Sequence, residues 1–566
     1  MGPWDEEWEE ESVAAARRQA AAAHARAAEA QAAAHAHPGD GLAIRTAAGW
    51  VHGKREHDDE GLDVSSWKGI PFGKDTALTG RFCAPEPVAA WEGVRECRDF
   101  GEVAPQPTYS WTERVIGSED CLNLDVVRPT GTQRLPVVVY LHGGSFIMGS
   151  SHMLMLRGFH LAQSMNVVYV SINFRLGALG YLDMRSLPGE CVANPAVLDQ
   201  LLALEWVRDN IAQFGGDPDN ITLMGESAGA AAVLTLMTSP AAQGLFHKAI
   251  AQSPPIGLIH SRAQSTLWAR ELVKRLALPR GSGIDELRAE EWPDLVRAGQ
   301  SMMWRAGELL HLNSCYAPTV DEDVLPAHPL EAFEKGRQAG VPLLVGTNSG
   351  ETSFAKYLFQ REDSRARAGL RLLRSFDERN AERVVDAYGR AEGRRDFADL
   401  LSDALFWAPT VRAAEAHAER YPTWMYRYDY TPMALRWLGL GAVHSLELAN
   451  VFGDPKSSRM SLVTKLGNGD AGESMTELMQ DHWARFIWES EPAPSWPRYR
   501  VEGAQESEES EEAELRATQV YDIPPRVDHD PKAEQRRAWE DYSMLEWGAG
   551  RPELLAELGF ITSEPD

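Results

Sequence analysis

The stretch Ile221-Thr222-Leu223-Met224-Gly225-Glu226-Ser227-Ala228-Gly229 decides the fold prediction for this chain. An apolar run that predicts a buried strand passes directly into a serine with a glycine two positions away on each side. A tight strand-to-helix turn strains the backbone of such a serine, and side chains at the flanking positions would collide with the strand and helix. The serine hydroxyl would then stand clear of the sheet as a candidate nucleophile. Chance alone supplies about 0.2 such matches in a chain of this length, so the remaining sequence must support it.

The bulk composition describes a large, acidic protein. The chain has 566 residues, of which 44% are hydrophobic, and its net charge of −27 argues against nucleic acid and anionic membranes as partners. No run approaches the 18 apolar residues of a membrane span. The acidic start at residues 1–7 is unlike a signal peptide, and five cysteines are too few for a disulfide scaffold. These features predict a cytoplasmic protein with reduced thiols, and they leave the oligomeric state open.

The chain divides into an extension and one large domain. Residues 1–42 form an alanine-rich, acidic N-terminal extension that we expect to be helical or flexible. Its histidines, His24, His35 and His37, are more simply explained as solvated than as metal ligands. Residues 43–566 are predicted to form a single domain, in which the Glu- and Ser-rich residues 503–514 make an acidic surface loop.

Short apolar runs alternate with helical patterns through this domain. A helical pattern is clearest at Leu201–Phe214. The alternation predicts an α/β fold with a mostly parallel central sheet and helices on both faces. The runs that predict strands are Pro136–Leu141, Val167–Asn173, Ile221–Met224, Lys248–Gln252, Pro342–Thr347 and Trp424–Tyr430.

A glycine-rich loop follows the predicted strand that ends at Leu141. The loop reads His142-Gly143-Gly144-Ser145-Phe146. Glycines allow backbone N–H groups to turn toward a bound carbonyl oxygen, as an oxyanion hole requires. An ordinary glycine turn is the simpler alternative, but the serine motif at Ser227 favours the functional interpretation.

A serine nucleophile in such a sheet needs an acid and then a base later in the chain. Glu351 directly follows the predicted strand at residues 342–347 and is the candidate acid. His444 lies in a glycine-rich loop and is the candidate base. Protonation of His444 would then abolish activity in acid, with a midpoint of about 6–7. The other late histidines are His417 and His482, which lie in helical patterns, and His529, which lies in the charged tail.

Further motifs, spread over about residues 43–540, carry a resemblance to a known family. They are Gly69-Ile70-Pro71-Phe72, Ser118-Glu119-Asp120-Cys121-Leu122-Asn123-Leu124, Asn173-Phe174-Arg175-Leu176-Gly177, Asp199-Gln200, Phe214-Gly215-Gly216-Asp217-Pro218, Gly346-Thr347-Asn348, and His444 with Glu447 and Val451-Phe452-Gly453. Together with the serine motif, they resemble the type-B carboxylesterases of the cholinesterase and carboxylesterase group.

The resemblance implies an α/β-hydrolase fold with helical insertions over the active site, and hydrolysis of small-molecule carboxylic esters without a metal or cofactor. It implies that Ser227 is the nucleophile, His444 the general base and then acid, and Glu351 the orienting carboxylate. It further implies backbone oxyanion donors at Gly144, Ser145 and Ala228, and supporting positions at Glu226 and Ser253, for which a purely structural role stays open.

Some residues depart from the family pattern. Ser145 and Ser445 stand where glycine is usual, and Ala104 replaces the cysteine that pairs with the equivalent of Cys121 in secreted relatives. A Cys97–Cys121 bridge stays open, although free thiols fit the cytoplasmic prediction. The same machinery could act on a carbamate, amide, thioester or lactone. A non-catalytic binding module of the same fold is the remaining alternative, and the complete set of three candidate residues argues against it.

Overall fold

The computed structural model describes residues 41–59, 61–108, 114–306, 314–357, 361–454, 469–503 and 515–545. Only Gly41 and Leu42 of the predicted extension, and only Gly503 of the predicted acidic loop, fall within these ranges. The three histidines of the extension therefore lie outside the described residues.

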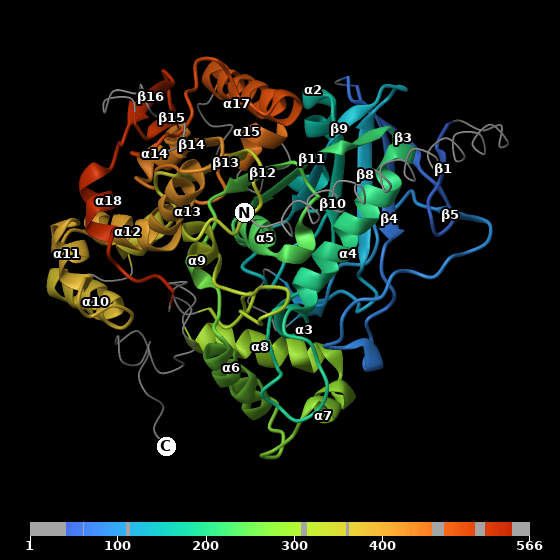
Figure 1. The fold of residues 1–566 in the computed structure, drawn as a ribbon, viewed down its shortest axis with the longest axis horizontal. Helices are drawn as coiled ribbons and strands as arrows, with labels where there is room; N and C mark the ends of the chain where they lie inside the picture. The colour runs from blue at the N-terminus through green and yellow to red at the C-terminus, as the bar shows by residue number, and fades with distance from the viewer. Residues whose placement is uncertain are drawn as a thin grey trace, which may run out of the picture.

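Within the described residues, eleven strands form one central sheet in the order β16-β15-β14-β13-β12-β11-β9-β10-β8-β4-β3 (Figure 1). Neighbouring strands from β15 to β10 run parallel, and antiparallel strands complete both edges. The strands are β3 (Lys54–His57), β4 (Asp63–Pro71), β8 (Asn123–Pro129), β9 (Leu135–Leu141), β10 (Val168–Ile172), β11 (Gly216–Glu226), β12 (Lys248–Gln252), β13 (Leu343–Asn348), β14 (Thr423–Tyr428), β15 (Ala517–Tyr521) and β16 (Arg526–His529). Shorter strands lie apart from this sheet: β1 (Ala43–Arg45), β2 (Trp50–His52), β5 (Val94–Glu96), β6 (Gln106–Pro107) and β7 (Val115–Ile116).

All six predicted strands are present, with small shifts of their ends. Strand β11 begins earlier than predicted, at Gly216, because its polar first half pairs with β9 through a register irregularity between Gly216 and Ile221. His529, which the sequence places in the charged tail, lies at the end of edge strand β16. The predicted helix at 201–214 is α4 (Pro195–Asn210), which starts at a proline suited to the first helical position, and a 3₁₀ turn (Ile211–Phe214).

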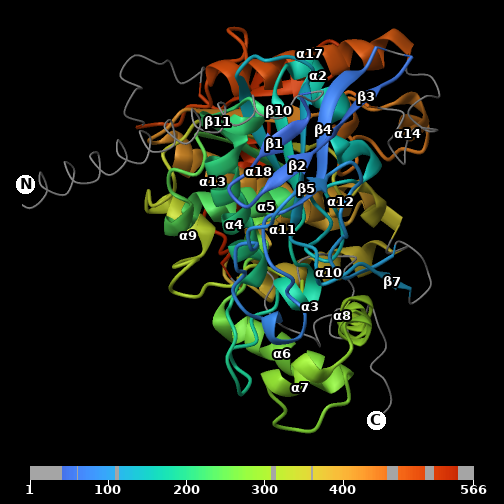
Figure 2. The ribbon, with the colours of Figure 1, turned by 90° about the vertical axis from the view of Figure 1, so that its right-hand side faces the viewer.

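The two faces of the sheet are buried by different helices. One core joins alternate strand residues such as Val139 and Leu223 to α4 and α5. The other joins Tyr140 and Met224 to α2, α15 and α17, which lie together along one side in Figures 1 and 2. Successive strand residues point to opposite faces, and the near-continuous apolar strands therefore serve both cores. The helices are α2 (Phe159–Met165), α3 (Gly177–Gly180), α4, α5 (Ala228–Thr238), α6 (Arg262–Arg275), α7 (Ile284–Ala289), α8 (Trp292–Ala306), α9 (Pro329–Glu334), α10 (Glu362–Arg374), α11 (Ala381–Asp386), α12 (Arg394–Ser402), α13 (Ala408–Ala418), α14 (Met433–Trp437), α15 (Leu448–Phe452), α17 (Gly469–Glu489) and α18 (Ala533–Trp539).

The helical insertions follow the carboxyl ends of two central strands. Helices α6–α9 separate β12 from β13, and α10–α13 separate β13 from β14. Both views place α6, α7 and α8 together at the lower end of the molecule (Figures 1 and 2). Among the helices in the described part of the chain, none combines the length and apolar character needed to cross a bilayer.

Candidate active site

Ser227 occupies the turn between β11 and α5. Its backbone has φ 56° and ψ −126°, a conformation that side-chain-bearing residues rarely adopt. A Cβ atom at Gly225 would lie 2.5 Å from the carbonyl carbon of Gly229, and one at Gly229 would lie 2.0 Å from the carbonyl oxygen of Leu141. Both glycines are therefore required for the turn, as the sequence motif predicts.

Glu351 lies just beyond the carboxyl end of β13, and its buried carboxylate is held on both oxygens. Oε1 accepts hydrogen bonds from the backbone N–H of Asn348 at 2.7 Å and from the Ser253 hydroxyl at 2.6 Å. Oε2 lies 2.6 Å from Nδ1 of His444. Since an ionised carboxylate can only accept, Nδ1 carries a proton and donates it to this bond.

His444 is fixed on a loop that is bonded to the Glu351 loop. The backbone N–H of His444 donates to the carbonyl of Glu351 at 3.3 Å, and that of Gly350 donates to the carbonyl of Ala442 at 3.0 Å. Phe406, from a π-helical turn (Asp403–Trp407) in the insertion after β13, packs on the imidazole with ring centroids 4.6 Å apart. The insertion thus shapes one side of the site.

The free edge of the imidazole faces a second carboxylate. Nε2 of His444 lies 3.3 Å from Oε1 of Glu226, whose side chain is 5% exposed. The same Oε1 accepts a hydrogen bond of 2.5 Å from the hydroxyl of Ser445. Ser227 and His444 are both described, and no hydrogen bond joins their side chains. Such bonds often form only once substrate is bound.

Three carboxylates surround His444 and change its protonation. Burial opposes the charged imidazolium, but the charges of Glu226, Glu351 and Glu447, with the hydrogen bond to Glu351, raise the pKa of His444 to about 9. Burial, with the charges of Glu226 and Glu351, raises the pKa of Glu447 to about 8. This raised pKa places the midpoint that we now expect for loss of activity above the 6–7 predicted from the sequence, because the sequence does not show how the carboxylates converge.

The glycine-rich loop after β9 lies against Ser227. A Cβ atom at Gly143 would lie 3.2 Å from that of Ser227 and 2.8 Å from Oε2 of Glu226. Gly144, Ser145 and Phe146 all have positive φ angles, at 120°, 56° and 64°. This backbone turns the loop sharply beside the serine.

The three predicted oxyanion donors have free N–H groups. Within the described part of the chain, the backbone N–H groups of Gly144, Ser145 and Ala228 have no protein acceptor. Ala228 is the first residue of α5, where an N–H has no partner inside its own helix. A carbonyl oxygen above Ser227 could therefore bind to donors that have no acceptor among the described residues.

Several contacts at the site were not predicted from the sequence. Phe406 lies 38 residues before His444 in the sequence, and no local pattern marks it. Ser445 stood out only as a departure from a glycine. Asn348 donates through its side chain to Glu447 at 2.5 Å as well as through its backbone to Glu351, and only the family motif indicated it.

The thiols and other polar groups give no second site of this kind. Cys97 and Cys121 are both free and buried, and burial raises the pKa of both, for Cys97 to about 12. No cluster of three or more metal-ligating side chains occurs in the ranges that the structure describes.

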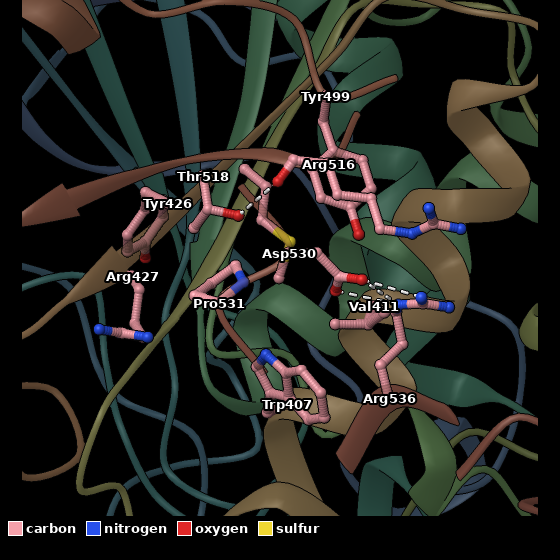
Figure 3. A pocket seen from close by; sticks show the side chains of 11 residues that line it. Trp407, Val411, Tyr426, Arg427, Tyr499, Arg516, Thr518, Asp530, Pro531 and Arg536 are labelled. Atoms are coloured by element: carbon pink, nitrogen blue, oxygen red, sulfur yellow. Dashed lines mark hydrogen bonds and ion pairs between the residues drawn. The ribbon is translucent and has the colours of Figure 1, made fainter. Parts of the chain in front are cut away.

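A small pocket lies at the β14–β15 end of the sheet (Figure 3), and none of the three triad candidates is among the residues that line it. Its lining includes Trp407 and Tyr499 together with three arginines. Each guanidinium already has an acidic partner: Arg536 bonds Asp530, Arg427 bonds Asp429 and Arg516 bonds Glu415. Paired charges of this kind leave little unbalanced charge to attract an ionic ligand.

Fold and site together define the class: an α/β-hydrolase with a strained serine elbow and a histidine–carboxylate pair at the carboxyl ends of adjacent parallel strands. The profile of the carboxylesterase family matches residues 40–539, and the chain belongs to this family. It is a carboxylesterase.

Individual relatives agree with this membership. The para-nitrobenzyl esterase of Bacillus subtilis is 33% identical over 506 residues, which cover 87% of this chain and 97% of that enzyme. The phenmedipham hydrolase of Pseudarthrobacter oxydans is 30% identical over 464 residues, covering 78% and 90%. The solved structure of a carboxylesterase from Geobacillus stearothermophilus superposes with a TM-score of 0.74 at 31% identity, covering 88% of this chain and all of that one.

Proposed function

We propose that Ser227, His444 and Glu351 hydrolyse small-molecule carboxylic esters through an acyl-enzyme. The observation that carries this proposal is a set of three N–H donors at and near the serine turn that have no acceptor among the described residues, together with a histidine held by a buried carboxylate in the loops after β13 and β14. The Nδ1–Glu351 bond leaves Nε2 as the basic nitrogen. Nε2 must leave Glu226 and reach the Ser227 hydroxyl for the reaction to begin.

The reaction then proceeds in two steps. Nε2 of His444 takes the Ser227 proton as the serine oxygen attacks the ester carbonyl. The carbonyl oxygen becomes negative and is bound by the N–H groups of Gly144, Ser145 and Ala228. His444 returns the proton to the departing alcohol and leaves acyl-serine, and water, activated by the same imidazole, releases the acid. Glu351 holds the required tautomer of His444 throughout. Ser253 holds the Glu351 carboxylate in place, and Glu226 contacts the opposite edge of the imidazole.

Labelling of the serine tests this assignment directly. A fluorophosphonate should add to the peptide that contains Ser227, and kcat for p-nitrophenyl butyrate should fall by about 10⁴–10⁶ in Ser227→Ala. Ser253→Ala is the matched control, since its hydroxyl is engaged with Glu351 and its loss should leave the labelling in place. Hydrolysis that survives in Ser227→Ala would overturn the assignment and reopen the binding-module alternative.

The substrate panel should begin with esters of nitrobenzyl alcohol, because one relative is named a para-nitrobenzyl esterase. Matched carbamates, amides, thioesters and lactones test whether the same machinery prefers another bond. A kcat/KM for an amide or carbamate above that for its ester would replace the ester assignment.

We also propose a reducing, cytoplasmic location. The support is that Cys97 and Cys121 are free thiols in this fold, as expected where disulfides do not persist. Fractionation of the native host with an antibody to this chain tests the proposal, and recovery from the medium or periplasm would contradict it.

A further inference from the structure

Ser445 follows the candidate base in the sequence, and its side chain contacts Glu226, which in turn contacts His444. Its backbone has φ 64°, in the left-handed region that favours glycine, and glycine is the usual residue at this place in the family pattern. The serine keeps the strained backbone and adds a hydroxyl. That hydroxyl donates to Oε1 of Glu226 at 2.5 Å, across 219 positions of sequence.

Glu226 is confined between two loops and the nucleophile. Its Oε1 lies 3.3 Å from Nε2 of His444. Its Oε2 lies close to Gly143, where an added Cβ atom would be only 2.8 Å from this oxygen. The side chain is 5% exposed, so water can do little to hold the carboxylate in place. Among the described residues, Oε1 of Glu226 has two neighbouring donors, which are the His444 imidazole and the Ser445 hydroxyl.

We propose that Ser445 is a positioning residue: its hydroxyl holds the Glu226 carboxylate against Nε2 of His444, so that Glu226 competes with Ser227 for the same edge of the imidazole. The inference rests on the proposed function for the identity of the base. It explains why Nε2 contacts Glu226 and not Ser227. It also predicts that removal of the hydroxyl releases the imidazole from this contact.

Removal of the Ser445 hydroxyl should change the pKa of His444 in a defined direction, which titration can measure. The groups that face His444 are Glu226 at the end of β11, Glu351 after β13, Glu447 before α15, and the uncharged ring of Phe406. The Ser445 hydrogen bond favours the ionised form of Glu226. Without it, Glu226 takes up a proton more readily, its charge no longer stabilises the imidazolium, and the pKa of His444 falls.

The experiment compares Ser445→Ala and Ser445→Gly with the wild type. Both variants lose the hydroxyl, but only the glycine relieves the positive φ. We expect the acid-side midpoint of the kcat/KM–pH profile to fall by roughly half a pH unit or more in both. The melting temperature should be higher in Ser445→Gly than in Ser445→Ala, because only the glycine relieves the positive φ. Ser490→Gly is the matched control, because Ser490 also has a positive φ, of 67°, and lies at the end of α17.

A double variant shows whether the effect passes through Glu226. In a Glu226→Gln background, Ser445→Gly should cause no further change of the midpoint. An unchanged midpoint in the single variants, or a shift that persists with Glu226→Gln, would overturn the proposal. Titration of the His444 imidazole by NMR in a Ser227→Ala background gives the same comparison without turnover. A failure of ester hydrolysis is therefore distinguishable from a failure of this inference.

Discussion

Replacement of Glu351 by glutamine should leave the fold intact and still remove most of the activity. Oε1 of Glu351 accepts from a backbone N–H and from the Ser253 hydroxyl, at 2.7 and 2.6 Å. A backbone N–H cannot reverse its direction, so the carbonyl oxygen of the glutamine must occupy the Oε1 position. Its NH₂ group then faces Nδ1 of His444, which must accept, and the ring proton moves to Nε2. That tautomer cannot take the proton of Ser227.

The size of the loss follows from the bonds involved. Recovery of the active tautomer would require the amide to turn its NH₂ group toward the N–H of Asn348. This would set two donors against each other and leave the buried N–H of Asn348 without an acceptor, at a cost of about 1–3 kcal/mol. The glutamine also lacks the negative charge that faces the imidazolium across a 2.6 Å contact. We expect kcat to fall by about 10³–10⁴, equivalent to about 4–5.5 kcal/mol.

The assay is steady-state hydrolysis of p-nitrophenyl butyrate, with melting temperature as the check on folding. The ¹⁵N shifts of the His444 ring report the tautomer directly. Ser253→Ala is the graded control, since it removes only one of the two donors to Oε1 and should cost about tenfold. A loss below tenfold in Glu351→Gln, or an unchanged tautomer, would refute the reasoning.

Three further predictions concern the same site and the core behind it. The kcat/KM–pH profile of the wild type should rise through a midpoint near 9. Glu226→Gln should lower this midpoint by about one pH unit or more, because a charge 3.3 Å from the ring contributes about 1.3 kcal/mol even in water. Pre-steady-state and steady-state pH profiles that give a midpoint of 6.5 for both proteins would contradict this. Gly144→Ala should lower kcat by about 10² or more, measured with p-nitrophenyl butyrate, because the new Cβ would stand 1.9 Å from a backbone carbonyl oxygen of its own loop. Arg175→Ala should destabilise the protein by about 3–5 kcal/mol in urea unfolding, because it leaves the fully buried carboxylate of Asp199 without its ion-pair partner. Replacement of both residues by apolar ones should recover part of the lost stability.

The parts of the site that the sequence predicts are those set by local sterics. The elbow needs glycine at 225 and 229 because a Cβ there would collide with the backbone of the adjoining helix or strand, and this constraint is visible in a five-residue motif. Strands buried on both faces are visible as apolar runs for a similar reason. The order of Glu351 and His444 after Ser227 follows from the chain path through the sheet.

The parts that the sequence does not predict depend on contacts between distant segments. Burial and charge at His444 come from carboxylates on three different elements, and no local pattern reports their distance from the ring. The polar start of β11 becomes a strand only because β9 is beside it. In each case a tertiary neighbour decides the outcome, and a single sequence carries no direct signal of that neighbour.

The two serines that replace family glycines show how such a departure gains a function. Ser145 and Ser445 both keep a positive φ, at 56° and 64°, so both carry a backbone cost of about 1 kcal/mol or more. Within the described residues, the Ser145 hydroxyl makes no hydrogen bond that would offset this cost, and we propose that Ser145 contributes only its backbone N–H to the site. The Ser445 hydroxyl binds a buried carboxylate that faces the base. The Ser445 hydroxyl therefore has a partner at the site, through which we propose that the histidine loop affects the protonation of His444, whereas the Ser145 hydroxyl has none among the described residues.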